Sequence, residues 1–331
     1  LYPEYWKQGN RAMTLDAALQ NDIVLTYLLI VASALGIAGL ALAVLTALGK
    51  NVGPIWKTYR GWLVMVPIVL GTVLLGRTAF IIGVALLAIF GFKEYARATG
   101  LYEDWWMTGL VYLGIVLLAA ASHVQDPRLG HDGWYGLFMA LPAYVIGAIL
   151  LVPIFRNKSK GQLQRIALAI VGFMYFGWMF SHLGFLANAQ YAYGYILYLL
   201  FAVEINDVAA FTCGKICGKH KLRENISPKK TLEGAIGALV ISVGLAWALS
   251  FSFPHFALWE VLLAGFIVGV GGQLGDLVIS YIKRDIGIKD MGAVIQGHGG
   301  ILDRVDSMIF VAPIFFHVVR WLHGLREVPV S

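Results

Sequence analysis

Acidic and basic side chains are concentrated in one stretch near the C-terminal end of the chain, from Lys283 to Asp306. Four bases and four acids fall within these 24 residues, and glycines surround the one histidine. The residues that could do chemistry are Lys283, Arg284, Lys289, Asp290, His298, Gly299, Gly300, Asp303, Arg304 and Asp306. Carboxylates are the ligands expected for Mg²⁺, whereas basic side chains and glycine amides hold phosphates. The stretch therefore predicts a site for a metal-bound triphosphate.

Further carboxylates occur within long apolar runs. Glu204 and Asp207 lie three residues apart, on one face of a predicted helix, and Asp276 lies among apolar neighbours. The spacing of Ser280, Lys283 and Arg284 after Asp276 predicts one polar stripe along a helix. Ionisable residues inside a membrane are costly, so these acids are candidates for function.

A third cluster has the sequence SPKKT, residues 227–231. Ser227 and Pro228 indicate a loop that opens a helix, so Lys229, Lys230 and Thr231 are expected at a helix N-terminus. Cations are unfavourable there unless an anion offsets them, and exposed amides, lysines and hydroxyls at a helix start can bind phosphate. The alternative is a basic loop that contacts lipid head groups.

The composition is that of an integral membrane protein. Of the 331 residues, 59% are hydrophobic and 13% are charged, whereas soluble domains carry about 25% charge. A membrane-spanning helix needs about 20 mostly apolar residues. The sequence predicts an all-α polytopic membrane protein with about ten spans, at roughly 23–48, 60–75, 77–93, 107–122, 134–154, 164–187, 191–213, 233–252, 257–282 and 305–322. The second and third are short, so one hairpin that does not cross is an alternative for them.

Basic residues alternate between the loops that join these spans. They follow the first, third, fifth, seventh and ninth spans, whereas 188–190 and 253–256 contain none. By the positive-inside rule the basic loops are cytoplasmic and both termini lie outside. The net charge of +6 reflects these loops and does not indicate nucleic-acid binding. No signal peptide is evident, and the absence of an initial Met predicts a trimmed N-terminus.

Polar chemistry divides the chain into two regions. Residues 1–190 are expected to form a lipid-facing helical scaffold, and 191–331 a catalytic region whose site faces the cytoplasm. Within the scaffold, Glu94 either pairs with Arg97 or lines a polar cavity. The loop at 123–132 contains two His and two Asp, which fit a metal site less well than a solvated loop. Cys213 and Cys217 are expected to be reduced packing residues, since a zinc site needs about four ligands.

The sequence resembles the phosphatidate cytidylyltransferase (CDP-diacylglycerol synthase) family at these clusters. The family signature appears as Ser280-Tyr-Ile-Lys283-Arg284, Lys289-Asp290, His298-Gly299-Gly300 and Ile301-Leu-Asp303-Arg304-Val-Asp306. Residues 227–234 are similar to the SPKKTxEG box, Gly275-Asp276 to the family's Gly-Asp pair, and Asp207 to an earlier aspartate. The resemblance is specific over 204–311, with departures from the usual pattern at Glu204, Phe211, Ala238, Ile279 and Gln296.

The resemblance implies transfer of a cytidylyl group from CTP to phosphatidic acid or a related lipid phosphate, which releases pyrophosphate. It implies Mg²⁺ on Asp276 and Asp303, with Asp207, Asp290 and Asp306 as further ligands or ligands of a second cation. Triphosphate and lipid phosphate would contact Ser227, Lys229, Lys230, Thr231, Lys283, Arg284, Lys289, Gly299, Gly300 and Arg304. His298 would orient a phosphate or a water.

Partners and rival functions follow from the same residues. The expected partners are CTP, a lipid phosphate and membrane lipids, not nucleic acid, and a homodimer is left open. The expected location is a bacterial inner (plasma) membrane. One alternative is a CTP-dependent polyprenol or phytol kinase, in which a hydroxyl attacks the γ-phosphorus. Another is a transporter for an anionic solute, although transporter sites are expected at mid-membrane on broken, repeated helices.

Overall fold

The computed structural model describes residues 13–127, 132–288, 291, 300 and 302–324, and for Asp303 only its place in a helix. The elements are almost all helical. In chain order they are α2 (Leu15–Leu19), α3 (Asp22–Ala47), α4 (Gly53–Leu74), α5 (Arg77–Ala98), the 3-10 helix η1 (Leu101–Glu103), α6 (Trp105–His123), α7 (Tyr135–Phe155), α8 (Gln162–Gly172), the π-helix η2 (Phe173–Met179), α9 (Phe180–Phe185), η3 (Leu186–Asn188), α10 (Ala192–Cys217), β1 (Lys221–Arg223), β2 (Ser227–Thr231), α11 (Leu232–Ala248), η4 (Ser250–Ser252), α12 (Leu258–Asp285) and α13 (Leu302–His323).

The prediction of an all-α integral membrane protein is confirmed. Within the described residues, eight helices are long and apolar enough to cross a membrane. The consecutive helical segments α8, η2, α9 and η3, residues 162–188, are counted as one of these eight. The apolar α11 has 17 residues and is shorter than predicted. Helices α4 and α5 have 22 residues each, about 33 Å at 1.5 Å per residue. Both are long enough to cross, but only α5 is among the eight helices that are also apolar enough. For α4 a full crossing therefore stays a prediction.

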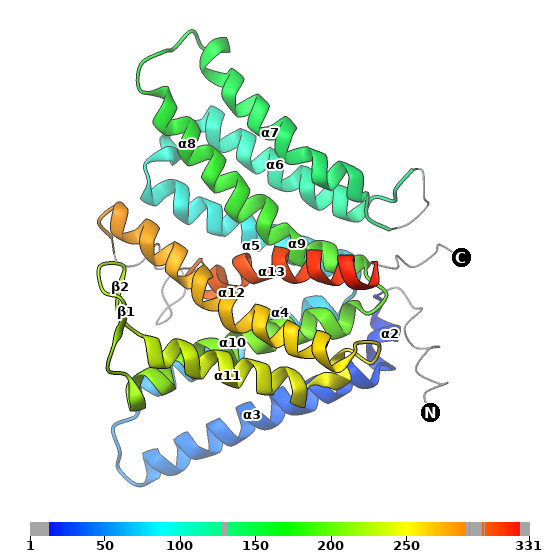
Figure 1. The fold of residues 1–331 in the computed structure, drawn as a ribbon, viewed down its shortest axis with the longest axis vertical. Helices are drawn as coiled ribbons and strands as arrows, with labels where there is room; N and C mark the ends of the chain where they lie inside the picture. Colours follow the sequence, from blue (N-terminus) through cyan, green and yellow to red (C-terminus); the bar gives the residue numbers. More distant parts are fainter. Residues whose placement is uncertain (1–12, 128–131, 289–290, 292–299, 301, 325–331) are drawn as a thin grey trace.

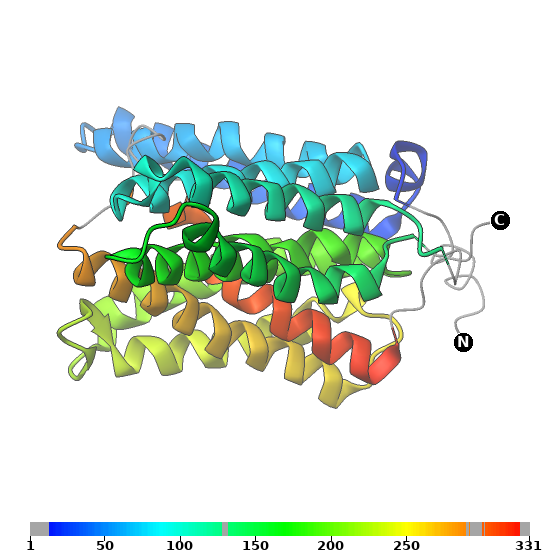
Figure 2. The ribbon, with the colours of Figure 1, turned by 90° about the horizontal axis from the view of Figure 1, so that it is seen from above.

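The long helices lie side by side, and their direction alternates along the chain (Figures 1 and 2). The β-hairpin, the end of α12 and the start of α11 lie at one end of the bundle, and α2 and the end of α13 lie at the other (Figure 1). We call the end with the β-hairpin the basic end. Among the Lys and Arg residues in the described ranges, only Arg77 and Arg320 belong to the other end. This arrangement matches the predicted alternation of basic loops.

Helices α10 to α13 pack closely around the candidate site. A Cβ atom on Gly275 of α12 would lie 2.7 Å from the carbonyl oxygen of Asp306 on α13, so the two helices meet through backbone. On its other side α13 packs against the N-terminal region, where the ring centroids of Phe316 and His182 are 5.1 Å apart. Helix α13 therefore lies between the two regions of the chain and contacts both.

Candidate active site

The centre of the site is an ion pair between Lys230 of β2 and Asp276 of α12. The Nζ atom of Lys230 also donates a hydrogen bond to Oε1 of Gln273, one helical turn before Asp276, at 3.2 Å. The side chains of Lys230 and Asp276 are 18% and 27% exposed, so the pair is accessible at the edge of the protein interior. Two residues predicted from separate sequence clusters are thus brought together.

The local structure of the SPKKT segment differs from the prediction. Residues 227–231 form β2, which pairs antiparallel with β1, and the helix begins only at Leu232. Thr231 is the N-cap of α11, and its Oγ1 accepts the amide hydrogen of Gly234 at 3.1 Å. Within the strand Lys229 is exposed, whereas Lys230 is half-buried. The predicted helix start is therefore wrong for the two lysines, which lie in the strand. It is correct for Thr231, which the structure shows to be the N-cap.

Polar side chains behind the ion pair continue into the interior of the bundle. Nε2 of Gln273 donates to Oδ1 of Asn206 on α10 at 2.8 Å, and Nδ2 of Asn206 donates to Oγ of Ser242 on α11 at 2.9 Å. All three residues are buried. Since buried polar groups are stabilised by such bonds, this chain fixes the positions of α10, α11 and α12 relative to the ion pair.

Two further predicted acids lie beside this network. Oγ of Ser307 on α13 contacts both carboxylate oxygens of Asp207 on α10, at 3.2 and 3.3 Å. Oδ1 of Asp306 accepts the amide hydrogen of Ser307 at 2.8 Å. The charges of Asp207, Asp276 and Asp306 are near enough to repel one another. Such a group of acids attracts cations.

Predicted basic residues also reach the acids. Lys283 interacts electrostatically with Asp306, and Arg304 with Glu204. Arg284 is exposed, and its Nε donates to the carbonyl oxygen of Ile226 at 3.3 Å, which ties the β-hairpin to the end of α12. The half-buried Ser227 is paired with Arg223 in the hairpin. Acids and bases are therefore gathered at the same end of the bundle.

Several predicted residues lie outside the described part of the chain. They are Lys289, Asp290, His298 and Gly299. Asp303 is in the first turn of α13, but its side chain is likewise not described. Gly300 is buried, and a Cβ atom there would lie 2.5 Å from Oε2 of Glu94. The roles given to these residues stay predictions.

The acids fit Mg²⁺ by donor type, because carboxylate oxygens are the ligands that this ion prefers. Asp207, Asp276 and Asp306 come from three helices and face the same region. Among the described residues, however, no three Asp, Glu, His or Cys side chains converge closely enough to hold an ion. The donor set is therefore suitable, and the complete coordination sphere is not defined by these residues.

Sequence reasoning did not identify Asn206, Gln273, Ser307 and Tyr175. The first two could have been found as amides inside apolar helices, since such groups need partners there. Tyr175 lies on the π-helix η2, and its hydroxyl is 3.3 Å from the carbonyl oxygen of Gly275 and 3.4 Å from that of Asp306. Only the folded chain reveals this contact between the N-terminal region and the acids.

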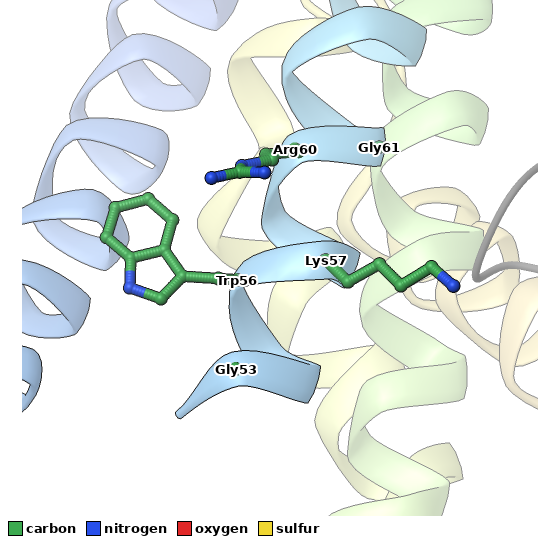
Figure 3. A pocket seen from close by; sticks show the side chains of 5 residues that line it. All are labelled: Gly53, Trp56, Lys57, Arg60 and Gly61. Atoms are coloured by element: carbon green, nitrogen blue, oxygen red, sulfur yellow. The ribbon is translucent and has the colours of Figure 1, made fainter. Parts of the chain in front are cut away.

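A second basic feature lies at the start of α4, at the basic end. A groove of about 750 Å³ is lined there by Gly53, Trp56, Lys57, Arg60 and Gly61 (Figure 3). The Trp56 side chain points towards α3, where Nε1 donates to Oγ1 of Thr46 at 2.9 Å. Tryptophan and basic residues together are typical of the membrane interface, where they contact lipid head groups. We call this feature the α4 groove.

The remaining polar features of the sequence have structural explanations. Asp132 of the 123–132 loop pairs with Arg77, with 3.6 Å between Oδ1 and Nη1. Both cysteines are free, and Cys213 packs where a Cβ atom on Gly237 would lie 2.6 Å from its Sγ. These observations agree with a packing role for Cys213.

A bundle of membrane helices with acids and bases gathered at one end is the arrangement of a membrane enzyme that handles phosphates. Comparison with known proteins narrows this class. A sequence model described as "Cytidylyltransferase family" matches residues 56–322. The chain therefore belongs to the cytidylyltransferase family and is a nucleotidyltransferase, which confirms the resemblance seen in the sequence.

Individual relatives agree with this assignment. The chain is 35% identical over 250 residues to a phosphatidate cytidylyltransferase of Staphylococcus haemolyticus, which covers 75% of this chain and 92% of the relative. It is 34% identical over 233 residues to the enzyme of the same name from Staphylococcus saprophyticus, covering 69% and 85%. An uncharacterized protein of Escherichia coli, YnbB, is 33% identical over 242 residues, covering 72% and 78%. These relatives give no support to a lipid kinase or a transporter.

Proposed function

We propose that this nucleotidyltransferase converts CTP and phosphatidic acid, or a closely related lipid phosphate, into a CDP-lipid and pyrophosphate. The observation that carries the proposal is the ion pair of Lys230 with Asp276. It places a cation of the SPKKT box against the acid of the Gly-Asp pair, beside the acids of α10 and α13. The staphylococcal relatives, which are named for phosphatidate cytidylyltransferase, support the choice of lipid.

The proposed reaction is a displacement at the α-phosphorus of CTP. An oxygen of the lipid phosphate forms a bond to that phosphorus, and the bond to the oxygen bridging the α- and β-phosphorus atoms breaks. Pyrophosphate leaves with the bridging oxygen. An ionised lipid phosphate has no proton to remove, so His298 is assigned to orienting a phosphate or a water. Such a reaction depends on positioning and charge neutralisation.

Cations around the acids would neutralise the triphosphate and the lipid phosphate. Lys230 and Lys283 are assigned to the phosphates nearest the acids, because both interact with acids of the cluster. The phosphates further from the acids are assigned to three other cations, namely Arg304, Lys229 and Arg284, all of which are exposed. The remaining contacts, from Ser227, Thr231, Lys289, Gly299 and Gly300, are proposed from the family resemblance alone.

Mg²⁺ is part of the proposal. When bound, it would offset the negative charge of the triphosphate and of the attacking lipid phosphate. Asp276 and Asp303 would hold the principal ion. Asp207, Asp290 and Asp306 would orient these ligands or hold a second cation.

The decisive experiment uses purified protein, Mg²⁺ and a panel of lipid phosphates and polyprenols. CTP labelled at the α-phosphate should transfer label to phosphatidic acid, with one pyrophosphate released per CDP-lipid formed. CTP labelled at the γ-phosphate should leave the lipid unlabelled. Transfer of the γ-label to a polyprenol would instead identify a kinase. If none of the lipid phosphates in the panel is converted, the proposed substrate class is contradicted.

The proposed location is a bacterial inner membrane with the basic end in the cytoplasm, residues 191–331 forming the catalytic region and 1–190 the scaffold. Cys217 offers a reporter, because it is exposed and lies at this end. With Cys213 replaced by Ser, a membrane-impermeant maleimide should label Cys217 only after the cells are permeabilised. Labelling of intact cells would contradict the orientation.

A further inference from the structure

Glu94 is a buried acid at the end of α5, in the N-terminal region. It is 7% exposed, and its Oε2 accepts the amide hydrogen of Leu302 at 3.0 Å. Leu302 is the first residue of α13, and the first amide groups of a helix have no acceptor within that helix. Glu94 therefore caps α13 from a helix that lies 208 positions earlier in the sequence.

The backbone before α13 also fits closely against Glu94. A Cβ atom on Gly300 would lie 2.5 Å from Oε2, 3.0 Å from Cδ and 3.1 Å from Oε1 of Glu94. Both carboxylate oxygens thus pack against this glycine, and no larger residue fits unless Glu94 moves. One turn earlier on α5, a Cβ atom on Gly91 would lie 3.9 Å from Cδ1 of Leu302. The same face of α5 therefore receives Gly300 and Leu302.

The segment that Glu94 holds leads directly into the site. Asp303 follows Leu302, and Asp306 lies one turn further along α13. A change in the direction or rotation of this first turn would move both acids together. The backbone contact at Gly275 fixes α13 against α12, but it lies beside Asp306 and leaves the start of the helix to be fixed by other groups.

We propose that Glu94 is a positioning residue for nucleotidyl transfer, which sets the start of α13 and thereby the position of Asp306 relative to Asp276. The inference rests on the proposed function, because it assigns the acids of α13 to the reaction. It extends that function by giving the N-terminal region a part in the site. Glu94 acts through the backbone of Gly300 and Leu302.

The test compares Glu94→Ala and Glu94→Gln with Asp104→Asn. Asp104 is a buried acid of the same region whose partners are Arg156 and Arg165. We expect Glu94→Ala to lower kcat by about a hundredfold, as for a small misplacement of a catalytic group. Glu94→Gln keeps the size and one acceptor oxygen, so its kcat should fall less. The thermal stabilisation that CTP gives should stay within about twofold of wild type, because the cations on β2 and α12 are unchanged.

A purely structural role of Glu94 would give the pattern expected of Asp104→Asn: a lower unfolding temperature with an unchanged kcat per folded molecule. That result would overturn the inference. If Glu94→Ala does not fold, the same comparison holds for Glu94→Gln. A wild-type protein that forms no CDP-lipid would instead contradict the proposed function, and the two failures are thereby distinguished.

A double-mutant cycle tests the contact itself. In the wild-type background, Gly300→Ala should lower kcat, because its methyl group displaces the Glu94 carboxylate. In the Glu94→Ala background the same change should cost less than in the wild-type background, because residues in contact are not additive. A loss that comes from the proposed phosphate contact of Gly300 would remain in both backgrounds. Equal losses in both backgrounds would show that Glu94 does not set the position of Gly300.

Discussion

Asp104 in residues 1–190 and Asp276 in residues 191–331 both lie near the basic end, yet their surroundings differ. The Asp104 side chain is 1% exposed and binds Nη1 of Arg156 at 2.7 Å and Nη1 of Arg165 at 2.9 Å. Asp276 is 27% exposed, pairs with Lys230 and has further acids as neighbours. The Asp104 cluster closes its acid off from water, contains more cations than acids, and joins helices. The Asp276 cluster is accessible and contains acids that repel one another, which suits the binding and release of ligands. Burial and charge balance thus distinguish Asp104 from Asp276.

The largest expected effect separates these two acids. Asp276→Asn keeps the size but removes the charge, and should lower kcat by about a thousandfold, as for loss of a preorganised charged group. Asp104→Asn should leave kcat per folded molecule unchanged. Steady-state assays at saturating CTP and limiting Mg²⁺ measure both. Near-normal turnover of Asp276→Asn would remove the basis for assigning metal binding to the acids of the C-terminal region.

Lys230→Met should act on the nucleotide. Loss of one charge-stabilising group costs about 2–4 kcal/mol, so kcat/KM for CTP should fall by roughly tenfold to a thousandfold. The assay uses neutral detergent micelles with no anionic lipid except the substrate. Lys229→Met is the matched control, because its side chain is exposed, and should lose less. If Lys230→Met weakens activity only in anionic bilayers, the lysine contacts lipid head groups instead.

Asp104 should control stability at acidic pH. Burial alone would raise the pKa of Asp104, but hydrogen bonds from Arg156 and Arg165 hold this pKa below its usual value. A depressed pKa stabilises the fold fully above the unfolded pKa of about 4, and this stabilisation is lost as the pH falls through the lower folded pKa. Asp104→Asn should lower the free energy of unfolding at pH 7 by about 3 kcal/mol.

Thermal unfolding in detergent between pH 7 and pH 3 measures this effect. The wild-type unfolding temperature should decline at the acidic end more steeply than that of the variant. Parallel curves would show that the arginine cluster does not stabilise the fold, and the contrast between Asp104 and Asp276 would then disappear.

Tyr175 tests whether the N-terminal region contributes to the site beyond Glu94. Tyr175→Phe removes the hydroxyl that lies between the carbonyl oxygens of Gly275 and Asp306. One such hydrogen bond contributes about 1 kcal/mol, which corresponds to roughly fivefold in kcat. Tyr198→Phe is the control, because it removes a buried hydroxyl from α10 that has no hydrogen-bond partner among the described residues. Identical kinetics for the two variants would limit Tyr175 to packing.

The α4 groove should give the smallest effect. Replacing Lys57 and Arg60 by Gln should reduce stimulation of activity by anionic lipid, at about 1 kcal/mol for each charge near the surface. Activity in neutral micelles should not change, because the groove residues are distinct from those of the acid cluster. A loss of activity in neutral micelles would extend the functional region to α4.

Local sequence signals predicted most of the fold. The span beginning at Arg77 and a helix start at Thr231 were found correctly, because hydropathy and helix-start signals depend on neighbouring residues. The strand at 227–231 was missed because it is stabilised by pairing with 221–223, and its Ser-Pro pair, read alone, indicated a loop that opens a helix. Strand formation in so short a segment depends on its partner.

The site was predicted less completely, because its contacts join distant residues. Lys230 and Asp276 were both identified as functional, but no pattern indicated that they pair. Asn206 and Gln273 are 67 positions apart, and each alone looks like an isolated amide in a helix. The capping of α13 by Glu94 joins residues still further apart. Such contacts arise from helix packing and have no periodic signal in the sequence.

The β-hairpin has a consequence for insertions and deletions. Because consecutive side chains of a strand leave on opposite faces, a shift of one residue exchanges the faces of all side chains in the strand. The one residue between Lys230 and α11 is Thr231, so its deletion would place Lys229 at the position that pairs with Asp276 and would also remove the N-cap of α11. The length of this segment is thus constrained as strictly as its composition. Point substitutions would not reveal the constraint, whereas single-residue deletions in the hairpin would.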